Sequence, residues 1–159
     1  MTLKTQNSKL KTNKGFTLIE LLIVVAIIGL LASVVLVGLG GFRARGRDAR
    51  RIADIRQSQN ALELFYTKNN KYPTVSGVNS WDSLKTSLIG GGIGVSTIPN
   101  DPLHASDSNK TYEYGVSSDL QNYVLKSSLE DSNNPALTDD VDGTIYGLSC
   151  DDPAYCVQF

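Results

Sequence analysis

A long apolar segment dominates the first third of the chain. No charged residue occurs in the 22 positions from Leu21 to Phe42, and a helix of that length rises about 33 Å, enough to cross the hydrocarbon core of a bilayer. We therefore predict a hydrophobic transmembrane helix over residues 16–42. Residues 1–15 are polar, include four lysines and show no apolar periodicity, so we expect them to be a leader.

Beyond this segment, apolar residues return at the spacing of one helical face. Ile52, Ile55 and Leu62 recur among charged and amide side chains, which is the pattern of an amphipathic helix packed on a domain. Pro73 should end this helix, because a proline disfavours helical geometry in the residue before it. Residues 43–71 are thus expected to be the amphipathic half of the same helix.

The remaining residues, 72–159, are expected to form a small extracytoplasmic globular domain rich in β-strands. A short helix that places Trp81 in the core should come first. The predicted fold class is α+β, a long N-terminal helix packed on a small antiparallel β-sheet. Three segments alternate apolar and polar side chains between turn residues and are the predicted strands, namely residues 112–116, 122–129 and 144–148.

The net charge of -1 conceals a strong asymmetry between the two ends of the chain. Residues 1–56 carry ten basic and three acidic side chains, whereas residues 72–159 carry three basic and twelve acidic ones. The 159 residues suffice for one core of ordinary size plus an appendage. This length excludes a large barrel or an enzyme with a separate cofactor domain.

A cluster of five arginines follows the apolar segment and is a candidate contact for an anionic partner. The simpler expectation is a solvated stretch that contacts lipid phosphates or the acidic half of neighbouring copies. The alternative is nucleic-acid binding, although no aromatic side chains alternate with these arginines. The cluster consists of Arg43, Arg45, Arg47, Arg50 and Arg51.

The chain contains two cysteines, Cys150 and Cys156. Two thiols cannot complete a tetrahedral zinc site, and the single histidine, His104, is distant in sequence. We expect a small disulfide loop, which requires an oxidising compartment and hence export of the C-terminal half. Two free cysteines are the alternative.

Three aspartates, Asp139, Asp140 and Asp142, precede Gly143. Calcium is bound by clusters of oxygen ligands, often with a glycine at the bend. The run lacks the full spacing of a calcium-binding loop and its distal glutamate. It is therefore a candidate Ca²⁺ site, with an ordinary acidic turn as the alternative.

The sequence offers little support for catalysis. It contains one histidine and no Gly-x-Ser-x-Gly elbow, and no metal-ligand spacing points to a catalytic centre. We therefore expect neither an enzyme nor a bound cofactor other than calcium. The alternative is a membrane-tethered hydrolase that uses His104 with Asp101 or Ser106.

The run Lys14-Gly15-Phe16-Thr17-Leu18-Ile19-Glu20 resembles the processing motif of type IV pilins and type II secretion pseudopilins. The resemblance implies that a prepilin peptidase cleaves between Gly15 and Phe16 and methylates the new amine of Phe16. It also implies that Glu20 of one subunit pairs with the Phe16 amine of its neighbour in a filament. A passive anchor would have no reason to carry Glu20, because an acid in an apolar span costs roughly 2 kcal/mol or more.

The similarity extends in weaker form to the C-terminal half. The Tyr72-Pro73 pair resembles the end of the helical stem in these families. Pilins have a cysteine-closed C-terminal region, and type II pseudopilins carry a calcium ion in a loop comparable to the aspartate run. The resemblance thus agrees with the expected disulfide and with the candidate calcium site.

The expected function is that of a structural subunit of a type IV pilus-like filament. The resemblance implies a single-pass protein of the bacterial inner membrane with its C-terminal domain outside, later assembled into a periplasmic or cell-surface filament. An assembly platform protein and a cytoplasmic ATPase would drive assembly. The alternatives are the major pseudopilin of a type II secretion system and a DNA-binding subunit of a competence pilus.

Overall fold

The computed structural model describes residues 15–74 and 80–159, except for the side chains of residues 35–39. The expected leader, apart from Gly15, lies outside the described residues. The chain divides into two compact units, one up to Gly40 and one from Gly41 onward. We call them the N-terminal unit and the C-terminal unit.

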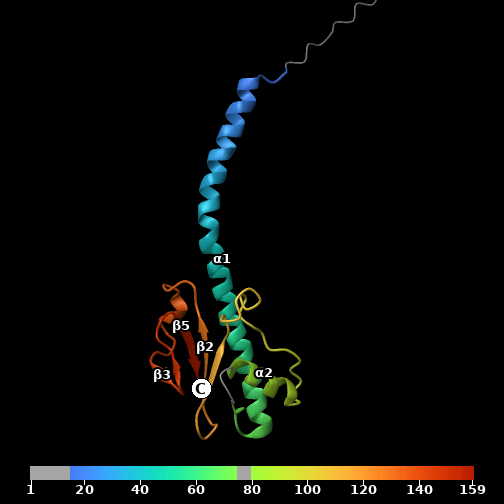
Figure 1. Ribbon diagram of the computed structural model, residues 1–159, viewed down its shortest axis with the longest axis vertical. Coiled ribbons are helices and arrows are strands. Elements are labelled where there is room, and N and C mark those ends of the chain that lie inside the picture. The colour runs from blue at the N-terminus through green and yellow to red at the C-terminus, as the bar shows by residue number, and fades with distance from the viewer. Residues whose placement is uncertain (1–14, 75–79) are drawn as a thin grey trace, which may run out of the picture. The chain divides into compact units, whose positions relative to one another are not determined.

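The helix α1 (Leu18–Asn69) is the long helix that the sequence predicts, and its backbone is continuous through Gly40 and Gly41 (Figure 1). In the N-terminal unit every described side chain is exposed. Among the residues that the structure describes, no helix combines the length and the apolar character needed to cross a membrane. The transmembrane span over residues 16–42 therefore stays a prediction.

The end of α1 follows from its local sequence. Asn70 adopts a left-handed conformation with φ of 53°, which asparagine tolerates better than most residues. Its backbone N–H donates to the carbonyl oxygen of Tyr66 at 2.7 Å, which closes the last turn. Pro73 follows three residues later, as the predicted end of the helix requires.

A three-stranded antiparallel sheet forms the β-layer of the C-terminal unit. Its order is β1 (Glu113–Val116), β2 (Tyr123–Ser128) and β5 (Ala154–Gln158). In the central strand, Leu125 lies opposite Tyr114 on one side and Val157 on the other. The α+β class and the first two predicted strands are confirmed.

The third predicted strand, over residues 144–148, is wrong. This segment forms a separate two-stranded hairpin of β3 (Thr144–Ile145) and β4 (Leu148–Ser149). The residues between them, Tyr146 and Gly147, have φ of 45° and 85°, a pair of positive values that belongs to a tight turn. The third strand of the main sheet is instead β5, at the C-terminus.

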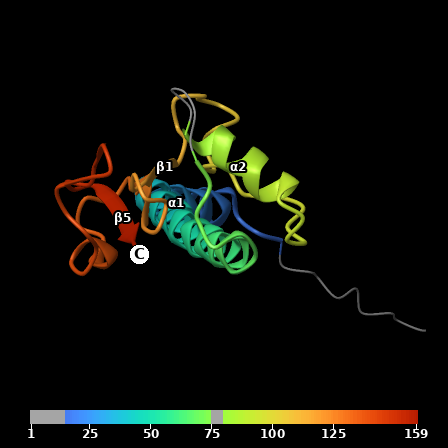
Figure 2. The same cartoon turned by 90° about the horizontal axis from the view of Figure 1, so that it is seen from below.

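The C-terminal unit buries one main core around α1. Figure 2 shows α1 with α2 (Ser80–Gly90) on one side and β5 on the other. Trp81, at the start of α2, is buried as predicted, and its indole N–H donates to the carbonyl oxygen of Pro99 at 3.0 Å. A short 3-10 helix, η1 (Pro135–Leu137), covers part of β5. Side chains from α1, α2 and the sheet fill the core, among them Ile55, Leu62, Leu84, Leu88, Tyr114, Tyr123 and Leu125.

A buried ionic cluster lies on α1 just before this apolar face. The guanidinium of Arg51 is 1% exposed and binds three carboxylates: Asp48 at 2.7 Å, Asp101 at 2.6 Å and Glu130 at 2.6 Å. A buried guanidinium can be retained only if its charge and its N–H groups find partners. We call these four side chains the Arg51 cluster.

The Arg51 cluster joins three segments that are distant in sequence. Asp101 belongs to the loop before β1, and Glu130 lies two residues after the end of β2. Asp48 also accepts the backbone N–H groups of Glu130 and Asp131 at 3.0 Å each. One face of α1 therefore fixes both loops.

Replacing Arg51 by Met should strongly destabilise the C-terminal unit. The buried carboxylates of Asp48 and Asp101 would lose their counter-ion, and breaking a buried pair from one side typically costs 3–5 kcal/mol, so we expect a loss of about that size in the free energy of unfolding. Urea unfolding of the full chain in detergent, followed by the fluorescence of the buried Trp81, measures it.

The matched control is Arg45→Met. Arg45 pairs with Asp131 at 3.3 Å, but its side chain is 71% exposed, so its loss should cost about 1 kcal/mol or less. Equal losses in the two variants would contradict the structural role of the Arg51 cluster.

Stability at low pH should depend on Glu130. Hydrogen bonds from Arg47, and further ones from Arg51, lower the pKa of Glu130 from its usual 4.5 to about 2. A carboxyl whose pKa is lower in the folded state stabilises the fold fully above its unfolded pKa, and this stabilisation is lost as the pH falls through the folded pKa.

The difference in unfolding free energy between the wild type and Glu130→Gln should accordingly be constant near neutral pH and shrink between about pH 4.5 and about pH 2. Urea titrations of both proteins across this range provide the measurement. A difference that stays constant down to pH 2 would show that the charge of Glu130 adds nothing.

Candidate functional site

The expected cleavage site is exposed and lies outside regular structure. Gly15 and Phe16 precede the first residue of α1, and Phe16 is 91% exposed. Among the described residues, leaving out the chain neighbours of Gly15, no heavy atom lies within 4 Å of the position that a side chain on Gly15 would take. The described part of the chain therefore leaves the peptide bond between Gly15 and Phe16 open to a protease.

Glu20, the acidic residue of the processing motif, caps the start of α1. Its Oε2 accepts the backbone N–H and the hydroxyl of Thr17, both at 2.8 Å, and the hydroxyl of Thr17 in turn accepts the backbone N–H of Glu20 at 3.3 Å. This reciprocal arrangement is a capping box, which satisfies donors that the first helical turn leaves free. The statement that an anchor has no reason to carry Glu20 is therefore wrong.

The N-terminal unit presents its apolar side chains on all sides of the helix. They include large side chains with exposed fractions from 51% for Ile23 to 84% for Leu18. Soluble monomers rarely expose contiguous apolar areas larger than a few hundred Å². This surface therefore requires lipid or other protein chains to cover it.

The structure places the five candidate arginines mostly in ion pairs within the chain. Arg47 binds the carboxylate of Glu130 through two nitrogens, at 2.7 and 2.6 Å. The prediction that Arg51 contacts an external anion is wrong, because its side chain is buried against three carboxylates. Arg45 pairs with Asp131 and Arg50 with Asp54, whereas within the described residues Arg43 has no ion pair.

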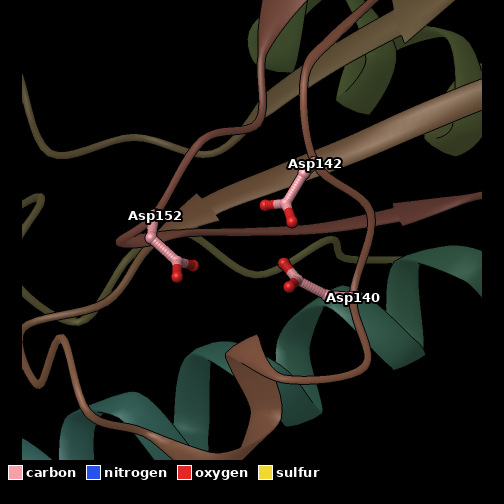
Figure 3. A group of neighbouring side chains, drawn as sticks. All are labelled: Asp140, Asp142 and Asp152. Carbon is pink, nitrogen blue, oxygen red and sulfur yellow. The ribbon is translucent and has the colours of Figure 1, made fainter.

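Three carboxylates gather beside β5 and form the acidic cluster of Asp140, Asp142 and Asp152 (Figure 3). One oxygen from each lies within 4.8 Å of the others. The sequence predicted the first two of these residues, but the third predicted one, Asp139, lies outside the group. Asp152 comes instead from the turn before β5.

The disulfide brings Asp152 to this place. Cys150 and Cys156 are bonded, with Cα atoms 5.7 Å apart, so the predicted disulfide is present and closes a loop that contains Asp152. The backbone N–H of Cys156 donates to Oδ2 of Asp140 at 2.8 Å. The cysteine spacing was the one signal in the sequence that could have pointed to Asp152, but the sequence analysis did not use it.

Asp140 is the most constrained member of the acidic cluster. Its Oδ1 is buried and has no hydrogen-bond partner among the described residues. Burial raises the pKa of Asp140, and the nearby charges of Asp142 and Asp152 raise it further, although the hydrogen bond from Cys156 opposes them. An orphaned carboxylate oxygen facing two other carboxylates fits an oxygen-liganded cation.

The residues of the alternative hydrolase are engaged in other contacts. Asp101 binds Arg51, and the hydroxyl of Ser106 donates to the carbonyl oxygen of Leu103 at 2.9 Å. Nδ1 of His104 lies 2.9 Å from the carbonyl oxygen of Lys110. This hydrogen bond of the His104 imidazole therefore goes neither to the carboxylate of Asp101 nor to the hydroxyl of Ser106, the two groups that would have to assist it.

Comparisons with known proteins support the assignment of the N-terminal segment. Residues 10–36 match the family model of the prokaryotic N-terminal methylation motif. The chain is 38% identical over 64 residues to the type II secretion system core protein G of Aeromonas hydrophila, and 38% identical over 63 residues to that of Escherichia coli. It is also 38% identical over 60 residues to the type IV major pilin protein PilA of Myxococcus xanthus.

These matches cover about 40% of the chain. They span 45% of the Aeromonas protein, 43% of the Escherichia coli protein and 27% of the Myxococcus protein, so the chain spans less than half the length of these relatives. No solved structure matches the chain. Residues 10–36 thus carry the prokaryotic N-terminal methylation motif, and over about 40% of its length the chain is similar to type II secretion pseudopilins and to a type IV pilin.

Proposed function

We propose that the chain is a structural, non-catalytic subunit of a type IV pilus-like filament. The observation that carries this proposal is the exposed apolar helix of the N-terminal unit, which begins next to an accessible Gly15-Phe16 bond. A bundle of such helices would bury their apolar side chains against one another. This role needs no catalysis. The side chains of His104 and Ser106 form hydrogen bonds with backbone carbonyl oxygens, which agrees with a non-catalytic subunit.

Glu20 would align neighbouring subunits in the bundle. Cleavage after Gly15 creates an amine on Phe16, and the family resemblance pairs that amine with Glu20 of the next subunit. An ion pair removed from water is favourable only in good geometry and with its remaining hydrogen bonds satisfied. It therefore selects one axial position among the many that apolar contacts alone would permit.

The remaining partners follow from the family. A prepilin peptidase would remove the leader and methylate Phe16, and the subunit would wait in the bacterial inner membrane with its C-terminal unit outside. A platform protein and a cytoplasmic ATPase would drive assembly. The disulfide supports this orientation, because disulfides persist in oxidising compartments.

Two alternatives remain within the family. The major pseudopilin of a type II secretion system is supported by the similarity to the core protein G of two species. A DNA-binding competence pilus subunit has less support, because four of the five candidate arginines have carboxylate partners in their own chain. Nucleic-acid binding would need free cations to release counter-ions from phosphates.

The test is expression of the full chain with a prepilin peptidase and the assembly machinery. The wild type should show the mass of a chain that begins at Phe16 with one added methyl group, and should be recovered in filaments sheared from the cells. Glu20→Gln should still be cleaved but give at least about tenfold less filament, because a hydrogen bond to a charged group contributes about 1.5–3 kcal/mol.

The control variant is Glu113→Gln, which removes the charge of a partly exposed carboxylate that pairs with Lys126 and should leave the filament yield unchanged. An uncut chain in the presence of an active peptidase would contradict the proposal. Filaments of Glu20→Gln at wild-type yield would contradict the role of the ion pair.

We also propose that the acidic cluster binds Ca²⁺. Asp140, Asp142 and Asp152 would supply carboxylate oxygens, and the orphaned Oδ1 of Asp140 supports the fit. A bound cation would neutralise three like charges and tie the disulfide loop to the segment before β3. The ion would therefore have a structural effect.

Calcium should raise the unfolding temperature of the wild type, measured by thermal unfolding of the full chain in detergent with added Ca²⁺ or a chelator. A ligand at 100 times its dissociation constant stabilises by about 2.7 kcal/mol, which gives a shift of several degrees. Asp152→Asn should lose most of this shift, whereas Asp139→Asn should keep it. Equal shifts in the two variants, or none in the wild type, would contradict the site.

A further inference from the structure

One segment of the C-terminal unit carries an acceptor sequence for an N-linked glycan. Residues 107–111 read Asp-Ser-Asn-Lys-Thr, and no other Asn-x-Ser/Thr triplet occurs in the chain. In exported proteins such a triplet, with any residue except proline in the middle, is the acceptor for glycan transfer to asparagine.

We propose that Asn109 is an N-glycosylation site of the exported C-terminal unit. Asn109 is exposed and occupies the third position of a turn, in which the backbone N–H of Lys110 donates to the carbonyl oxygen of Asp107 at 3.0 Å. Among the contacts of the described residues, the side-chain amide of Asn109 has no hydrogen-bond partner. Its Nδ2 is therefore free for transfer.

The neighbouring groups leave the acceptor accessible. The carboxylate of Asp107 accepts the backbone N–H of Asn109 at 3.0 Å, which shapes the turn without using the amide side chain. Thr111 is exposed, and its hydroxyl makes one long bond, at 3.2 Å, to the carbonyl oxygen of Tyr112. A transferase that recognises the asparagine and the hydroxyl two residues later can therefore reach both.

Both ends of the loop are fixed to α1, so the loop can be modified without opening the core. At one end Asp101 binds Arg51, and at the other the hydroxyl of Tyr112 donates to Asp54 at 2.8 Å. Between them, His104 bonds the carbonyl oxygen of Lys110. Asn109 thus lies on an exposed loop whose two ends are anchored to α1, as expected for an acceptor residue at the protein surface.

A hollow lined by both polar and apolar side chains adjoins the acceptor. It has a volume of about 630 Å³ and is lined by Asn109 together with groups that can form hydrogen bonds, among them Asp82, His104, Thr111 and Glu113. A space of this size holds a small ligand. The first sugars attached to Asn109 can therefore lie against hydroxyl, imidazole and carboxylate groups.

The transfer requires a donor of defined class, an oligosaccharide linked through its C1 atom to a polyprenyl pyrophosphate. Nδ2 of Asn109 attacks C1, and a C1–N bond forms. The bond from C1 to the pyrophosphate oxygen breaks, the lipid pyrophosphate leaves with that electron pair, and one amide proton passes to a base. No oxidation or reduction occurs.

The proposal rests on the proposed export of the C-terminal unit, and one tryptic digest of the chain from its native cells tests the two separately. The fragment of residues 86–110, or its extension to Lys126, should carry added hexose or hexosamine masses. The N-terminal fragment reports processing on its own, because it begins at Phe16 after peptidase cleavage and at Gly15 otherwise.

Two variants should lose the added mass, Asn109→Gln and Thr111→Ala, whereas Thr111→Ser should keep it because it retains the hydroxyl. Asn133→Gln, on an exposed turn outside any triplet, is the matched control and should keep it as well. An unmodified wild-type fragment beside an N-terminal fragment that begins at Phe16 would overturn the glycan and leave the filament proposal intact. Added mass that persists in Asn109→Gln would also overturn it.

Discussion

The C-terminal unit depends on one buried guanidinium. Arg51 holds three carboxylates from three parts of the chain, and Asp48 beside it binds the backbone of the segment after β2. The position of both loops relative to α1 follows from these contacts. The apolar core below them can then close with Ile55 and Leu62 facing the sheet. Because each buried charge needs its partners, few other conformations of these two loops are compatible with the folded C-terminal unit.

Periodicity in the sequence was sufficient to predict the amphipathic half of the long helix and two strands of the main sheet, whereas Pro73 indicated where the helix ends. The periodic elements bury apolar side chains at regular spacing, which a sequence shows directly. The partners of Arg51 could not be predicted in the same way. Arg51 was assigned to a solvated cluster of like charges, because nothing in the local sequence shows that Asp101 and Glu130, about 50 and 79 residues away, approach the same face of α1.

The C-terminal segment shows the same difference between local and distant contacts. The pattern over residues 144–148 predicted one strand, but two successive positive φ angles at Tyr146 and Gly147 turn the chain back on itself. Two of the three residues of the acidic cluster were predicted, and Asp152 was missed because it lies in the disulfide loop and not next to the other two in sequence. The acceptor sequence at Asn109, in contrast, lies within residues 107–111 and can be recognised from the sequence alone. The structure shows in addition that Asn109 is exposed.

The capping box at the start of α1 uses only one of the two carboxylate oxygens of Glu20 and leaves the other available for a second contact. Both bonds with Thr17 go to Oε2 of Glu20, and within the described part of the chain Oε1 has no partner. An amine from a neighbouring subunit can approach Oε1 while the cap stays intact. The first helical turn would thus be ordered before docking, and its conformational entropy would not have to be lost when subunits meet. In the proposed filament, this order would preorganise the subunit for addition to a growing end.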